Sequence, residues 1–130
     1  MASINFTVAN PIEDYTIQFT GTVLQVKLFC RKQHSFWFYI PRPIVRALNI
    51  QAGTPAYFYV VDNTTLVLSF RDPHLHKAKV RKVSYAGSKE DLTLIIPSTL
   101  VTREILERTS NLQFINPTGV TNHEWQLRLL

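Results

Sequence analysis

Two arginines in a short helical segment are the side chains best placed for chemistry, and that chemistry is phosphate binding. Arg42 and Arg46 are four residues apart, so in a helix they share one face. No Asp or Glu occurs in residues 15–61, so no neighbouring acid offsets a repulsion of roughly 0.2–0.5 kcal/mol. The arginine guanidinium donates paired hydrogen bonds to phosphate oxygens. The pair therefore predicts contact with a phosphate backbone, the alternative being a solvated helix face.

Further basic residues precede and follow this helix. Lys27, Arg31 and Lys32 lie in or beside a polar loop at residues 31–35, which is either a second phosphate contact or an ordinary turn. The segment 71–82 holds five bases against one acid, and it could follow a phosphate backbone or serve as a solvated connection. These additional candidates are Arg71, Lys77, Lys79, Arg81 and Lys82. A later helical segment differs, because Arg103 can pair with Glu107 and Arg108 with Glu104, which favours a structural role.

Composition and charge narrow the class of protein. The chain has 130 residues, a net charge of +5 and 45% apolar residues, which suffices for one folded unit. Residues 1–82 carry ten Lys and Arg against four acids, whereas residues 83–130 carry four against five. The single cysteine, Cys30, excludes an internal disulfide and is expected to be a buried strand residue. Without a signal peptide or a long apolar run, we expect a cytoplasmic, nucleoid-associated protein with no membrane contact.

Signals for catalysis, cofactors or metals are weak. The sequence has no phosphate-binding glycine loop, no dinucleotide fingerprint and no zinc-protease motif. His74 and His76 lack a companion pair at metal-binding spacing, and Glu90 and Asp91 are adjacent rather than opposed. We therefore expect no enzyme activity, no cofactor and no metal. Trp37 and Tyr39 could stack on the bases of a single strand, although a core or interface role is favoured.

The elements that must position these residues are mainly strands. Alternating and β-favouring segments predict strands at residues 15–20, 23–29, 36–40, 56–61, 65–70, 79–85, 92–96, 112–115 and 124–129. The 36–40 strand reads as apolar on both faces. A short helix should begin near Pro43 and end at Asn49, and a second should span residues 99–108 with Ser98 as its N-cap.

The order of these elements repeats along the chain. Superimposing Pro41 on Pro97 aligns the strands that precede them and the helix and hairpin that follow. The predicted organisation is a strand extension at 1–22, a basic first repeat at 23–70, a basic connection at 71–78 and a divergent second repeat at 79–130. We expect one folded unit of 1–130, because a single repeat leaves apolar faces and strand edges open.

A spaced set of residues precedes the hairpin strands at 57–61 and 65–70: Ile40-Pro41, Ile44, Arg46, Leu48, Ile50 and Gly53. With this set, about residues 25–70 resemble the AbrB/MazE-like (SpoVT-AbrB) family of DNA-binding domains, which has Ile-Pro, a helical Ile, Arg and Leu, then Ile and Gly, and a two-strand hairpin in the same register. The segment departs from the family at Phe36 and Asn49, where the family has glycine, and at Thr54, where it has an acid. The second repeat matches only at residues 94–97 and in element order.

The resemblance implies a swapped-hairpin β-barrel made by two interlocking βαββ repeats, here within one chain. It also implies one basic and one neutral half, with DNA held by basic residues of loop and helix. The function we expect is therefore double-stranded DNA binding in transcriptional regulation, with a homodimer as a further option. Two alternatives remain: an antitoxin-like protein-binding module, disfavoured by the strand-like segment 125–130, and a non-enzymatic viral or structural assembly protein.

Overall fold

The computed structural model describes residues 23–31, 35–86, 88–116 and 123–130, and every structural statement below concerns these residues. The predicted strand at 15–20, within the extension 1–22, lies outside them. The fold is mainly β with two short helices, as the alternating patterns predict. The elements are β1 (Val23–Lys27), β2 (Phe29–Arg31), β3 (Ser35–Tyr39), α2 (Arg42–Leu48), β4 (Pro55–Asp62), β5 (Thr65–Ser69), β6 (Lys79–Lys82), β7 (Ser84–Ala86), β8 (Ser88–Ile95), α3 (Arg103–Arg108), β9 (Asn111–Ile115) and β10 (Glu124–Leu129).

Several predicted boundaries are wrong. The single strands expected at 23–29 and 79–85 are each divided, at Leu28 and Val83, into a pair of strands that belong to different sheets. The second helix begins later than predicted, because Thr102 rather than Ser98 caps it: its Oγ1 accepts from the Ile105 N–H at 3.3 Å. Both hydroxyl residues suit an N-cap, so local chemistry alone does not choose between them.

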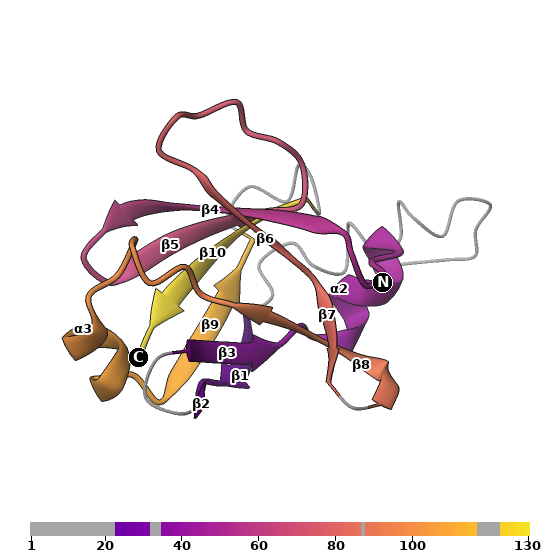
Figure 1. Cartoon of the computed structure of the whole chain (residues 1–130), viewed down its shortest axis with the longest axis horizontal. Coiled ribbons are helices and arrows are strands. Elements are labelled where there is room, and N and C mark those ends of the chain that lie inside the picture. The colour runs from indigo at the N-terminus through magenta and orange to yellow at the C-terminus, as the bar shows by residue number, and fades with distance from the viewer. Residues whose placement is uncertain (1–22, 32–34, 87, 117–122) are drawn as a thin grey trace, which may run out of the picture.

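The strands form two antiparallel sheets (Figure 1). The six-stranded sheet has the order β1-β9-β10-β5-β4-β6, and the four-stranded sheet has the order β2-β3-β8-β7. Both sheets are open, so the closed barrel expected from the resemblance is not formed by the described residues. The division at Leu28 and Val83 is the physical reason, because each long strand leaves one sheet for the other instead of closing either.

Both strand orders read the same when the two halves of the chain are exchanged. Each strand from β1 to β5 is exchanged with the strand five places later, so that β1 becomes β6 and β6 becomes β1. The strand order of each sheet is then the original order written backwards. Backbone hydrogen bonds repeat in the same way. Ile40 N–H donates to Leu92 O at 2.9 Å, and Ile96 N–H, 56 residues later, donates to Phe36 O at 2.8 Å. The described chain thus has an approximate two-fold axis between β3 and β8, where Phe38 faces Leu94.

The halves also exchange strands. β1 of the first half pairs with β9 of the second, and β6 of the second half pairs with β4 of the first. One hydrophobic core draws on both halves, with Phe38, Phe114 and Trp125 fully buried. Their rings meet edge to face, at 5.6 Å between Phe38 and Phe114 and 6.2 Å between Phe114 and Trp125. Each half therefore contributes part of the other's core.

Candidate nucleic-acid interface

The helix α2 presents the two arginines on its exposed side. Pro43 in the first turn presets the helical backbone, and Ile44 is fully buried and anchors the helix. Asn49 ends the helix in a left-handed conformation, with φ 52° and ψ 48°. Arg42 and Arg46 are both exposed, as their spacing predicts.

Arg42 has an acidic partner that the sequence does not reveal locally. Its Nη2 lies 3.0 Å from Oδ1 of Asp91, on β8, with the two side chains 58% and 37% exposed. Arg46 has no acidic partner among the described residues. Although residues 15–61 contain no acid, only Arg46, and not Arg42, lacks an acidic partner among the described residues.

Of the predicted basic loop, the structure describes Ser35 and the backbone of Arg31, the last residue of β2 (Phe29–Arg31). β2, which leads into it, lies beside α3: Leu28 N–H donates to Ser110 O at 3.0 Å, and a shallow groove there is lined by Lys27 and Glu107. Lys32 lies outside the described residues, and only the backbone of Arg31 is described. The structure thus places β2 beside α3. The expected division into a basic and a neutral half stays a prediction, because residues 32–34 and the side chain of Arg31 lie outside the described part of the chain.

The helix α3 is neutralised by its own side chains, as predicted. Arg103 Nε lies 3.2 Å from Glu107 Oε2, and Arg108 pairs with Glu104. Both pairs are exposed and span one helical turn, so they contribute little beyond local helix stability. This helix offers no uncompensated charge to an anion.

In the segment 71–82, some cations contact neighbouring groups of the protein and others are exposed. Arg71 Nη2 lies 3.1 Å from His123 Nε2, and Lys77 Nζ donates to Val60 O at 3.3 Å. Burial, and then the Arg71 charge, lowers the pKa of His123. Lys79 and Lys82 are exposed on β6, and Arg81 between them is half-buried. The later residues of this segment are therefore the better anion contacts.

β6 and α2 belong to the same end of the molecule. Gly53, shortly after the helix, donates its N–H to Val83 O at 2.8 Å, and Val83 N–H donates to Thr54 O at 2.9 Å. These bonds hold the β6–β7 junction against the segment that follows α2. The arrangement brings Arg42, Arg46 and Lys82 to neighbouring elements.

The expectation of a core position for Trp37 and Tyr39 is wrong. Within β3, Phe36 and Phe38 are buried, whereas the alternate residues Trp37 and Tyr39 lie on the outer face of the four-stranded sheet. Phe29 stacks on Trp37 at 4.6 Å between ring centroids, and Tyr39 meets Trp37 edge-on at 5.2 Å. The interface role remains a prediction, and it now falls on a face outside the core.

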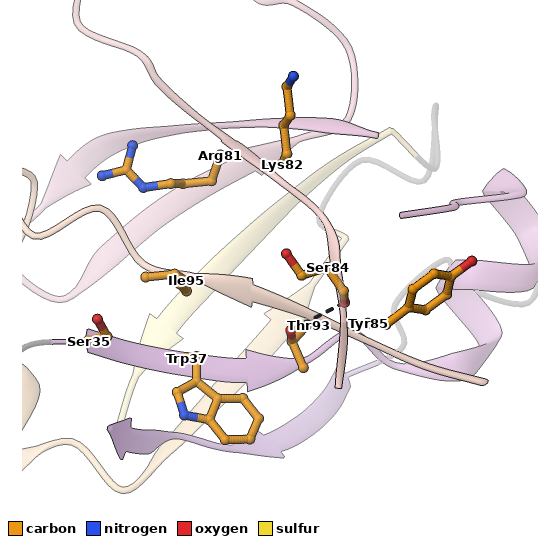
Figure 2. A pocket seen from close by; sticks show the side chains of 8 residues that line it. All are labelled: Ser35, Trp37, Arg81, Lys82, Ser84, Tyr85, Thr93 and Ile95. Carbon is orange, nitrogen blue, oxygen red and sulfur yellow. Dashed lines mark hydrogen bonds between the residues drawn. The ribbon is translucent and has the colours of Figure 1, made fainter. Parts of the chain in front are cut away.

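A pocket of about 160 Å³ opens on this face (Figure 2). Its wall contains the aromatic residues Trp37 and Tyr85, the cations Arg81 and Lys82, and the hydroxyl residues Ser35, Ser84 and Thr93. The sequence indicates the two cations only as phosphate contacts and contains no pattern that distinguishes Tyr85. The signal that could have found this wall is the alternation of Ser35, Trp37 and Tyr39 opposite Phe36 and Phe38.

Other candidates stay isolated. Cys30 is exposed rather than buried, because β2 is a three-residue strand at the edge of its sheet. The described residues contain no group of three His, Cys, Asp or Glu side chains able to hold a metal ion. They also contain no helix long and apolar enough to cross a membrane.

Comparison with known proteins adds no relative: no family model, no curated protein and no solved structure matches this chain.

Proposed function

We propose that this chain is a double-stranded DNA-binding protein that regulates transcription, with α2 as its principal DNA contact. We propose further that its two halves are divergent AbrB/MazE-like repeats joined as a swapped-hairpin fold. The observation that carries both proposals is the reciprocal pairing of β1 with β9 and of β6 with β4. Interlocking of two units is what the resemblance implies.

The backbone conformations of Asn49 and Gly53 also support the proposal that the first half is an AbrB/MazE-like repeat. Asn49 stands where the family pattern has glycine, and its φ of 52° lies in the left-handed region that glycine adopts most readily. Asparagine is among the few other residues that tolerate this region. Gly53, which matches the pattern, has φ 92°. The departure at Asn49 is therefore compatible with the backbone of the motif.

The charges around α2 favour a phosphate backbone as the ligand. Arg46 is exposed and unpaired among the described residues, and Arg42 can exchange Asp91 for a phosphate because their ion pair is solvated. Lys82 on the neighbouring strand adds a third cation. An approximate two-fold axis also suits a DNA site with two half-sites. Pairing of two such chains as a homodimer would extend the same symmetry.

Selection of bound fragments from random duplexes, followed by fluorescence anisotropy against salt, tests the proposal. With about four to six phosphates neutralised, log K should fall against log[salt] with a slope of roughly −4 to −5. A slope near zero, or no binding at low salt, would overturn it.

Paired substitutions locate the contact. Arg42→Ala with Arg46→Ala should weaken duplex binding severely, because both cations on α2 are lost. Arg103→Ala with Arg108→Ala is the matched control on α3 and should do little, because those arginines are already paired. Equal losses from the two double variants would refute the assignment of α2.

A further inference from the structure

The outer face of the four-stranded sheet carries a second set of features that the duplex contact does not use. Strand register places its side chains in two rows: Phe29, Trp37 and Ile95 in one, and Tyr39, Thr93 and Ser84 in the other. Tyr39 is 38% exposed and Ile95 is 42% exposed. Large apolar side chains gathered on an outer face mark a binding surface more often than isolated ones do.

The charged side chains that line the pocket are of one sign. Arg81 and Lys82 line the pocket, and none of the residues lining it is acidic. Beyond the pocket, Lys27 Nζ lies 5.5 Å from the centroid of the Phe29 ring, at the far end of the first row. Figure 2 shows Arg81 and Lys82 leaving the strand that crosses β8 in different directions. A ligand that fits this face must therefore be anionic as well as flat and apolar.

The size of the pocket indicates what enters it. At about 160 Å³ it is smaller than the roughly 300–1,000 Å³ typical of pockets that enclose a whole small-molecule ligand. It suits one ring-sized group, with the rest of the ligand continuing outside across the aromatic row. Ser35 and Ser84 supply hydroxyls, and Thr93 Oγ1 donates to Ser84 O at 3.3 Å, which leaves its lone pairs to accept.

We propose that this face binds single-stranded nucleic acid, with one base in the Trp37 pocket and its neighbours on the Phe29–Trp37–Tyr39 cluster. Aromatic rings stack on bases irrespective of sequence, and a row of cations follows the phosphates. A second copy of this chain fits less well, because a two-fold contact would bring Arg81 and Lys82 toward their own copies. The proposal does not depend on duplex binding through α2, since the two sites share only Lys82.

Binding of labelled oligothymidylate to the full chain at low salt tests the role of the ring. Trp37→Leu removes it and should weaken binding about 5- to 150-fold, the range for loss of stacking on one base. Trp37→Phe retains a ring and should restore most of the affinity. Circular dichroism and thermal melting show whether both variants are folded.

A charge variant and an optical signal supply independent readouts. Arg81→Gln with Lys82→Gln should make the salt slope shallower by about 1.4, at about 0.7 per phosphate contact on a single strand. Arg128→Gln, an exposed arginine on β10 of the other sheet, is the control and should leave the slope unchanged. The oligomer should quench tryptophan emission in the unaltered chain but not in Trp37→Phe, because Trp125 is fully buried.

Four results would overturn the proposal. The first is unchanged binding in both Trp37→Leu and the double charge variant. The second is absence of oligomer binding at low salt. The third is competition by thymidine monophosphate as effective as that by the oligomer, which would mean a free nucleotide site. The fourth is self-association that Trp37→Leu abolishes, which would make the face a contact between copies. Loss of duplex binding in the Arg42→Ala, Arg46→Ala variant is none of these results and does not bear on the single-strand proposal.

Discussion

Removing the carboxylate that faces Arg42 should strengthen DNA binding. Arg42 Nη2 and Asp91 Oδ1 lie 3.0 Å apart in a solvated pair, so their attraction stabilises the fold by only about 0–1 kcal/mol. In the unaltered protein a phosphate must displace Asp91 before it can bind Arg42. Asp91→Asn keeps the shape of the side chain and removes this competition.

The expected gain follows from the energy of that pair. Removing up to about 1 kcal/mol of competition tightens duplex binding by up to about fivefold. The slope of log K against log[salt] should stay the same, because Arg42 neutralises the same phosphate in both proteins. Anisotropy titrations of one selected duplex at several salt concentrations measure both quantities, and the free energy of unfolding should fall by no more than about 1 kcal/mol.

A matched control exists in the second helix. Glu107→Gln changes the net charge by the same amount and releases Arg103, which lies 3.2 Å from Glu107. Because α3 is not the proposed contact, this variant should bind DNA as the unaltered protein does. Identical affinity for Asp91→Asn and the unaltered protein would refute the reasoning, and so would an equal gain from Glu107→Gln.

Three further predictions concern stability and assembly. Residues 1–75 expressed alone should aggregate or self-dimerise, because β1 and β5 lose β9 and β10; a soluble monomer in sedimentation would contradict this. The free energy of unfolding should fall as the pH drops below about 6.5, because the lowered pKa of His123 lets the unfolded chain take up that proton first; His123→Gln should flatten this part of the pH profile in urea titrations. Asn49→Gly should preserve or raise stability, whereas Asn49→Val should lower it by about 1–2 kcal/mol in the same assay, because φ is 52° there.

Much of the secondary structure follows from local patterns. Alternation of apolar and polar residues located most strands of the described chain, and Pro43 and Asn49 bounded the first helix. The divisions at Leu28 and Val83 have no comparable local signal, because they arise where a strand passes from one sheet to the other. The prediction of a closed barrel was wrong for the same reason, because two long strands of the described chain pass from one sheet to the other.

The candidate site was predictable residue by residue but not as an arrangement. Spacing placed Arg42 and Arg46 on one exposed helix face, yet the partner Asp91 is 49 residues away and comes from the other half. The strand that precedes the predicted loop, β2, lies beside α3, and no local pattern in the sequence indicates this neighbour. For Trp37 the sequence left a core and an interface role open, because a run of aromatic residues does not show which face of the strand each one occupies.

The pairing of β1 with β9 also constrains how the protein is made. During synthesis the first half leaves the ribosome before its partner strands exist, so β4 and β5 keep open edges until β6 and β10 follow. Folding must therefore wait for nearly the whole chain, and pairings of such long sequence separation form slowly. Neighbouring nascent chains could meanwhile supply the missing strands to one another. Chaperone dependence and expression yield should accordingly respond more to the rate of translation than to the stability of the finished fold.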